Sequence, residues 1–315
     1  MKFKRRFAII EKSMELTKYN TKGILTMKVK IITDSNSGIL QSEATDLGIF
    51  VIPMPFTIDM EEYLEEISIS QEEFYQKLAM DAEVTTSQPS RYYLEELWEE
   101  QLKDADEIVY IPMTSGLSKT CENAINYAEK FDGKVQVVDN KRISIVMKTS
   151  VFEAIEYAKQ GLSAKEIKEK LESEKDKSSI YITMGVLKYL KKGGRISPAA
   201  AALGSMLKVK PILTSRGENF EKFAVALSIG QAKKKMLEQV IKEINGEFKE
   251  DYLAGKMVVS VAHTQNEKEA LKFKEEIIKA LPDVKFRFVD PLSLSVSCHI
   301  GPGALAIAIC KDNLA

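Results

Sequence analysis

The sequence contains none of the short motifs that mark the common nucleotide, zinc and hydrolase sites. Its 315 residues include no GxGxxG or GxxxxGK(S/T) phosphate-binding loop. They also include no HExxH zinc motif and no GxSxG nucleophile motif. Only two histidines are present, His263 and His299, so a histidine-rich metal site is excluded. These absences argue against a metal, a cofactor and the commonest catalytic sites, but not against a binding protein.

The sequence is also poor in cysteine, in net charge and in long apolar runs. Cys121, Cys298 and Cys310 lack the spacing of disulfide or metal sites, which favours a reducing compartment. The net charge of −1 gives no strong attraction to nucleic acid or anionic lipid. No stretch approaches the ~18 apolar residues that a membrane helix needs. We therefore expect a cytoplasmic protein with no nucleic-acid partner and at most transient membrane contact.

The first 26 residues have a basic start but do not form a signal peptide. The apolar run Phe7–Ile10 is too short for a signal core, and Glu11 ends it. Met27 directly precedes a strong strand pattern. We expect residues 1–26 to be an extension outside the fold, with Met27 as the natural start. The alternative is that this segment is a docking helix.

Short apolar segments alternate with segments of helical periodicity. The expected strands are Val29–Ile32, Ile49–Ile58 as an irregular segment, Ile108–Ile111, Val135–Val138, Val258–Ala262 and Phe286–Val289, with a hairpin at Arg216-Gly217. This alternation is typical of the α/β class with a mostly parallel sheet. The length favours two domains, which we place at 27–178 and 179–315.

Two hydroxyl clusters stand at predicted junctions between a strand and a helix. The first is Thr85-Thr86-Ser87-Gln88-Pro89-Ser90, with Pro89 suited to the first turn of the helix. The second is Thr114-Ser115-Gly116-Leu117-Ser118-Lys119-Thr120. Ligands of open α/β sheets bind beyond the carboxyl ends of strands, where helix N-termini offer N–H groups to anions. The alternative interpretation is that these hydroxyls only cap helices.

Two further segments could take part in a site. His299 precedes Gly301-Pro302-Gly303, a bare turn that lets backbone approach a ligand closely. A histidine entering such a turn can donate to a carboxylate, or it can serve a local turn. Lys191-Lys192-Gly193-Gly194-Arg195 is either a solvated turn or a cationic rim beside an anionic headgroup or a partner.

From Lys28 to Ile309 the chain resembles the DegV family of bacterial fatty-acid-binding proteins, also called FakB. The resemblance rests on Ile31-Ile32-Thr33-Asp34-Ser35, Thr86-Ser87-Gln88-Pro89-Ser90, Ser115-Gly116-Leu117-Ser118, Leu187 to Ile196, Lys210-Pro211-Ile212, and His299 with Gly301-Pro302-Gly303. Each motif is weak alone, but their order and spacing together are specific.

The resemblance implies a Rossmann-like parallel-sheet domain, a smaller α/β domain and a buried acyl tunnel. It also implies that a long-chain fatty acid, such as C16–C18, is presented to a fatty acid kinase. The acyl phosphate then passes to an acyltransferase of phospholipid synthesis, so the binding protein itself is no enzyme. The family's carboxylate-binding residues fall on Thr86, Ser118 and His299. Further headgroup or partner contacts are expected from Ser87, Lys119, Thr120, Arg195, Gly301 and Gly303.

The sequence departs from the family in two places. Ser118-Lys119-Thr120-Cys121 stands where the family usually has Ser-Gly-Thr-Tyr, and Gly230-Gln231 occupies the region of a usual arginine. A lysine beside the headgroup alters either the charge balance of the ligand or the docking of the partner, and the missing arginine bears on kinase docking. The alternative function is a hydrolase that uses Ser118 or Cys298 with His299, although adjacent residues rarely face each other productively.

Overall fold

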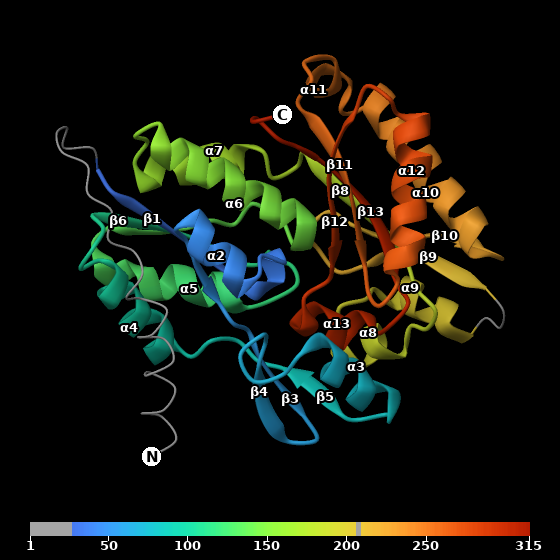
Figure 1. Cartoon of the computed structure of the whole chain (residues 1–315), viewed down its shortest axis with the longest axis horizontal. Helices are drawn as coiled ribbons and strands as arrows, with labels where there is room; N and C mark the ends of the chain where they lie inside the picture. The colour runs from blue at the N-terminus through green and yellow to red at the C-terminus, as the bar shows by residue number, and fades with distance from the viewer. Residues whose placement is uncertain (1–26, 206–208) are drawn as a thin grey trace.

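The computed structural model describes residues 27–205 and 209–315, with the side chains of 204 and 205 left aside. The expectations for residues 1–26 lie outside the described residues. The first half of the chain forms a four-stranded sheet in the order β2-β1-β6-β7, and all its pairs are parallel (Figure 1). Its strands are β1 (Val29–Asp34), β2 (Phe50–Ile52), β6 (Glu107–Ile111) and β7 (Val135–Val137).

Helices cover both faces of this parallel sheet. They are α2 (Gln41–Leu47), α4 (Arg91–Gln101), α5 (Thr120–Ala128), α6 (Ser144–Lys159) and α7 (Ala164–Ser173), with 3-10 turns η1 (Ser35–Ser37) and η2 (Glu129–Phe131). Ile31 packs with α6 and α7, whereas its neighbour Ile32 packs with α4 and α5. Burial on both faces explains why these strands are continuous apolar runs in the sequence.

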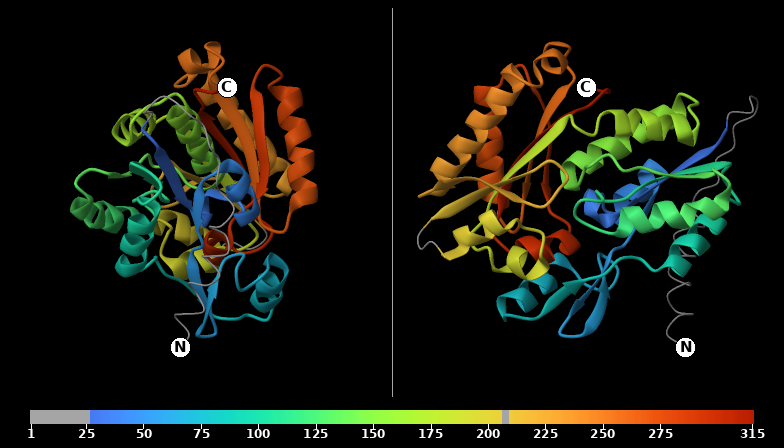
Figure 2. Two further views of the ribbon diagram at one scale, coloured as in Figure 1. Left: turned by 60° about the vertical axis from the view of Figure 1, so that its left-hand side comes forward. Right: turned by 180° about the vertical axis from the view of Figure 1, so that it is seen from behind.

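The second half forms a six-stranded sheet in the order β10-β9-β8-β13-β11-β12 (Figure 2). Its strands are β8 (Ser178–Thr183), β9 (Lys210–Ser215), β10 (Glu221–Ala226), β11 (Met257–His263), β12 (Lys285–Pro291) and β13 (Leu305–Lys311). Only β11 and β12 are parallel partners; the other pairs are antiparallel. The expected mostly parallel arrangement therefore holds for the first sheet alone.

Two layers of helices cover the six-stranded sheet. On the outer face lie α10 (Ile229–Asn245), α11 (Lys249–Leu253) and α12 (Glu267–Ala280) (Figure 1). On the inner face, toward the first half, lie α8 (Lys188–Gly193), α9 (Pro198–Ala201), the turn η3 (Ala202–Ser205) and α13 (Leu294–Ile300). Within the described residues, no helix is long and apolar enough to cross a membrane.

The central strand β13 carries side chains of different sizes on its two faces. Leu305, Ile307 and Ile309 pack into the outer layer. Ala306 and Ala308 point the other way, into the inner apolar layer. Because side chains alternate along a strand, only small side chains line the inner face of the sheet along β13.

A small antiparallel sheet, β4-β3-β5, stands apart from the other two. It consists of β3 (Pro55–Ile58), β4 (Glu61–Leu64) and β5 (Val84–Thr86), with helix α3 (Gln71–Ala79) between β4 and β5. Its apolar residues pack with Leu294 and Cys298 of α13. Figure 1 shows this sheet and α3 beside α13 and α8.

Candidate functional site

Thr86 and His299 meet where the small sheet contacts α13. Thr86 is the last residue of β5, and His299 lies in the last turn of α13. The hydroxyl Oγ1 of Thr86 lies 3.0 Å from Nε2 of His299. The sequence pattern predicted His299 at the entry of the Gly301-Pro302-Gly303 turn; it lies in the last turn of the helix that precedes this turn.

Two glycines make room for the histidine ring and the end of its helix. A Cβ atom on Gly193 would lie 2.0 Å from Nδ1 of His299. Gly301 ends α13 with φ of +75°, and a Cβ atom there would lie 2.2 Å from the ring of Tyr189. Any larger residue at either position would displace His299 or α8, since real Cβ atoms do not approach other atoms so closely.

The environment of His299 keeps its ring neutral near pH 7. Burial and, to a smaller extent, the positive charge of Arg195 together lower the pKa of His299 to about 4. A neutral imidazole carries one N–H and one acceptor nitrogen, so it can donate one hydrogen bond without bringing a positive charge.

Ser118 lies in the loop before α5, and its hydroxyl is partly engaged. Its Oγ lies 2.9 Å from Oγ1 of Thr120 and accepts the Thr120 N–H at 3.2 Å. Arg195 connects this loop to the histidine. Its Nε donates to the carbonyl of Leu117 at 3.2 Å, and another guanidinium nitrogen donates to the carbonyl of Gly193. Arg195 therefore ties the residue before Ser118 to the glycine that packs against the His299 ring.

A second contact joins the same loop to the second half of the chain. Thr114 Oγ1 donates to the carbonyl of Gly217 at 2.7 Å. A Cβ atom on Gly116 would lie 2.2 Å from that carbonyl oxygen, so the loop and the hairpin between β9 and β10 approach backbone to backbone. This close approach sets the distance between the Ser118 loop and the hairpin of the second half.

Three of the predicted residues have polar groups that are engaged by partners other than Thr86 and His299. Lys119 is exposed, and its Nζ lies 2.5 Å from Glu122. Ser87 is exposed, and its hydroxyl faces the carbonyl of Pro55 at 3.4 Å. Gly303 is exposed, and its N–H donates to the carbonyl of Thr264 at 2.7 Å. Their assignment as headgroup or partner contacts stays a prediction, because an exposed residue can still contact a partner.

Helix α4, which follows the first hydroxyl cluster, begins after Pro89 and not at it. Ser90 is the N-cap of α4, and its Oγ accepts the N–H of Tyr93 at 3.2 Å. Pro89 therefore lies one residue before the cap and not in the first turn. The capping role that we weighed against ligand binding applies to Ser90, and not to Thr86.

The geometry gives no support to a hydrolase. Cys298 is buried, and burial raises the pKa of its thiol far above the ordinary value, so no thiolate nucleophile forms. His299 presents Nε2 to Thr86, whereas the Ser118 hydroxyl is paired with Thr120. Across residues 27–205 and 209–315, no cluster of three or more His, Cys, Asp or Glu side chains could hold a metal ion.

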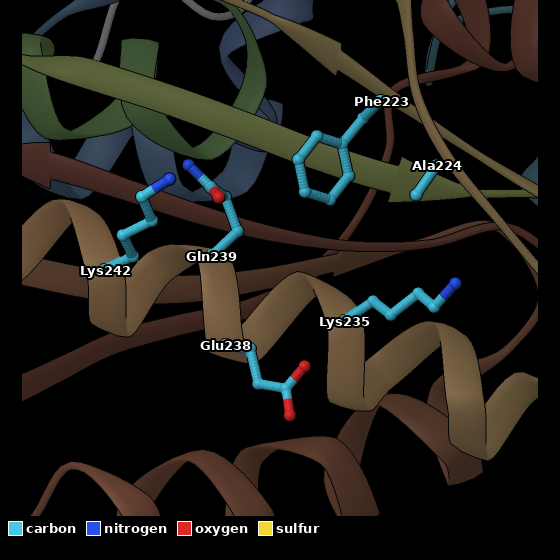
Figure 3. Close-up of a pocket in the computed structure, with 6 residues that line it drawn as sticks. All are labelled: Phe223, Ala224, Lys235, Glu238, Gln239 and Lys242. Atoms are coloured by element: carbon cyan, nitrogen blue, oxygen red, sulfur yellow. The ribbon is translucent and has the colours of Figure 1, made fainter.

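A shallow pocket lies away from these residues, between β10 and α10 (Figure 3). It has a volume of about 240 Å³ and is lined by Phe223, Ala224, Lys235, Glu238, Gln239 and Lys242. Because it opens on the outer side of the six-stranded sheet, it does not belong to the Thr86–His299 site.

Comparison with known proteins assigns the family. A family model described as "Uncharacterised protein, DegV family" matches residues 28–312. The chain belongs to the DegV family. A DegV domain-containing protein of Staphylococcus aureus (strain N315) is 31% identical over 281 residues, which cover 89% of this chain and 98% of that protein.

Solved structures of DegV proteins have the same fold. "Fatty Acid Binding of a DegV family Protein from Thermus thermophilus" matches with a TM-score of 0.81 and 26% identity, over 90% of this chain and 100% of that one. "DegV, a fatty acid binding protein from Bacillus subtilis" matches with a TM-score of 0.75 and 30% identity, over 90% of this chain and 99% of that one. Both of those DegV proteins are described as binding fatty acid.

Proposed function

We propose that this protein binds one long-chain fatty acid of about 16–18 carbons and holds its carboxylate at Thr86, Ser118 and His299. The observation that supports this most is the contact between Thr86 and His299, which places a hydroxyl and a neutral imidazole side by side. Each carries one donor hydrogen, so both can donate to a carboxylate oxygen that replaces their mutual contact, and Ser118 offers a third hydroxyl from the loop before α5.

The inner apolar layer of the second half is the proposed place for the acyl chain. His299 stands at its edge, since the next residue, Ile300, is part of that layer. Ala306 and Ala308 face this layer, and their small side chains obstruct an acyl chain between the sheet and α8, α9 and α13 less than larger ones would. Burying a tail of ~16 carbons contributes roughly 12 kcal/mol before the cost of association. The tail therefore supplies most of the affinity, and the headgroup contacts supply orientation.

Presentation of the carboxylate to a fatty acid kinase is the second part of the proposal. A bidentate arginine would neutralise the carboxylate strongly and reduce its reactivity toward a phosphate. Here the guanidinium of Arg195 is engaged by the carbonyls of Leu117 and Gly193, which leaves uncharged donors for the headgroup. The acyl phosphate then serves an acyltransferase of phospholipid synthesis in the cytoplasm.

The contact with the kinase is the part of the proposal in which this chain departs from its family. Gly230 and Gln231 lie in the first turn of α10, where Ser228 caps the helix by accepting the Gln231 N–H at 3.2 Å. Lys119 is exposed beside the Ser118 loop. A kinase surface that recognises this chain must accept a lysine at one position and no arginine at the other.

Lipid extraction from the purified protein tests the first part. We expect mass spectrometry to find fatty acid at close to one molecule per chain after purification from a bacterial host. Absence of any acyl species, together with no uptake of added palmitate, would refute fatty-acid binding.

Reconstitution with a bacterial fatty acid kinase tests the second part. The lipid-loaded protein, ATP and Mg²⁺ should yield acyl phosphate, which hydroxylamine traps as a hydroxamate. Palmitate in detergent without the protein is the control. Equal product with and without the protein would contradict presentation while leaving lipid binding intact.

A further inference from the structure

Glu65 is a buried carboxylate that the site described above does not use. It directly follows β4, is only 3% exposed, and has both oxygens engaged. Its Oε2 accepts the Ser35 hydroxyl at 2.6 Å, and its Oε1 accepts the backbone N–H of Leu294. Leu294 is the first residue of α13, the helix whose last turn carries His299.

The small sheet therefore holds α13 at both ends. Leu64 of β4 pairs with Pro55, and Thr86 of β5 pairs with the adjacent Phe56. Glu65 and Thr86 thus leave the same end of the sheet, on either side of β3. Glu65 binds the start of α13, and Thr86 contacts its end.

Two further polar contacts set the rotation of the helix. Ser295 donates to Oδ1 of Asn36 at 2.5 Å, and the hydroxyl of Tyr75 donates to Ser297 at 3.0 Å. All these partners come from the first half of the chain, although α13 belongs to the second half in sequence. His299 follows Leu294 by five positions in the helix, which corresponds to about 7.5 Å of rise. A helix this short moves as one body, so a shift at its start appears at its end.

From this geometry we infer that Glu65 is a positioning residue for the fatty-acid carboxylate site: its contact with the start of α13 fixes His299 against Thr86. The inference rests on the proposed function of that site. A carboxylate suits the position because the first N–H groups of a helix lack partners within the helix and attract negative charge. An apolar residue could fill the same space but could not hold Leu294 and Ser35 together.

The test compares two ligands that share a tail and differ in the headgroup. Palmitate and hexadecanol are titrated into the full-length protein stripped of lipid, at pH 8. The ratio of their affinities isolates the headgroup contribution. We expect Glu65→Ala to lower the preference for palmitate about tenfold, as for the loss of one hydrogen bond to a charged group. Glu65→Gln keeps an acceptor for Leu294 and a donor for Ser35, so it should restore the ratio to within about threefold.

Lys233→Ala is the matched control for a general loss of stability. Lys233 is buried in α10 and paired with Glu269 and Glu276 on the outer face of the sheet, far from α13. This variant should melt at a lower temperature with an unchanged affinity ratio. Should Glu65→Ala not fold, Glu65→Asp serves instead, since its shorter side chain cannot reach Ser35 and Leu294 at once.

Histidine NMR gives a second readout, because the chain has only two histidines. The ring signals of His299, assigned with His263→Gln, should shift in Glu65→Ala and return in Glu65→Gln. A melting temperature that falls while the affinity ratio and the His299 signals stay at wild-type values would overturn the inference. A wild-type protein with no preference for palmitate over hexadecanol would instead overturn the proposed function.

Discussion

The Thr86 hydroxyl lies 3.0 Å from Nε2 of His299, although 213 residues separate them in the chain. Both side chains are only half-buried, so either can be replaced without opening a cavity in a core. The contact joins the small antiparallel sheet to a helix of the second half. Substitutions at this contact therefore report on the site more directly than on folding.

Thr86→Val should weaken fatty-acid binding while leaving the fold intact. Valine has the shape of threonine but cannot donate to a carboxylate, a loss worth about 1.5–3 kcal/mol. We expect a ten- to hundredfold rise in the dissociation constant for palmitate, measured by calorimetry. Thr85→Val is the matched control, because the Thr85 hydroxyl faces Thr57 at 2.6 Å and not His299. Equal losses in both variants would contradict the role of Thr86.

His299→Gln should remove one loss of unfolding free energy that the wild type undergoes as the pH falls. The pKa of His299 is about 4 in the folded protein and near 6.5 when the chain is unfolded. Between these values the unfolded state binds the extra proton, so stability falls as pH decreases through this window. From pH 7.5 to pH 5 this loss amounts to roughly 2 kcal/mol in the wild type.

Denaturant unfolding at both pH values measures this effect as the difference between wild type and variant. That difference is needed because Glu65 and Asp34 act in the opposite direction. Burial raises their pKa values to about 7 and about 6, so they favour the folded state as pH falls. An identical pH profile in the two proteins would show that His299 is not held neutral.

Replacing Arg195 separates its charge from its hydrogen bonds. Arg195→Gln removes the positive charge beside His299, so the pKa of His299 should rise, as read by NMR titration. Arg195→Lys keeps the charge but cannot bridge the carbonyls of Leu117 and Gly193 in the same way. The lysine variant should keep the low pKa and still bind palmitate more weakly, because the Ser118 loop is released. An equal rise in the pKa of His299 in both variants would contradict the assignment of the low pKa to the charge of residue 195.

Ala306→Leu should block the acyl chain. The added atoms would fill the inner layer at the centre of the sheet and cost about 1–3 kcal/mol of stability as well. Ala270→Leu, in the outer layer, is the control for overpacking alone. We expect co-purified fatty acid to be lost only from the Ala306 variant. Retention of a full complement of lipid there would place the tail elsewhere.

The parallel sheet was predictable from the sequence, whereas the small sheet was not. Strands β1 and β6 are buried on both faces and therefore appear as continuous apolar runs. Strands β3, β4 and β5 have only three or four residues each, with Pro55 at the start of one and two glutamates in another. Strand β13 was also missed, although its run Leu305–Cys310 is entirely apolar, because an apolar run of this length does not by itself distinguish a buried strand from a buried helix.

The candidate site also contains residues that could be predicted from the sequence and one that could not. Thr86, Ser118 and His299 were singled out through a family resemblance and their junction positions, and the structure brings Thr86 and His299 together. Glu65 was not anticipated. It lies in the run Glu61-Glu62 to Glu65-Glu66, which has the pattern of a solvated segment. Its burial arises from packing against α13, more than 200 residues later, and no local pattern encodes such a contact.

The position of β13 has a consequence for how the protein is made. Of the strands in the described residues, β13 is the last in the chain, yet it lies between β8 and β11 in the sheet. During synthesis the strands β8–β10 and the strands β11–β12 therefore form two separate groups. Each group has an unpaired edge until β13 has been synthesised and can pair with β8 and β11. Open edges invite pairing with other chains. We therefore expect a ribosome-bound chain that ends before Leu305 to depend on chaperones, and the first half to fold well before the second.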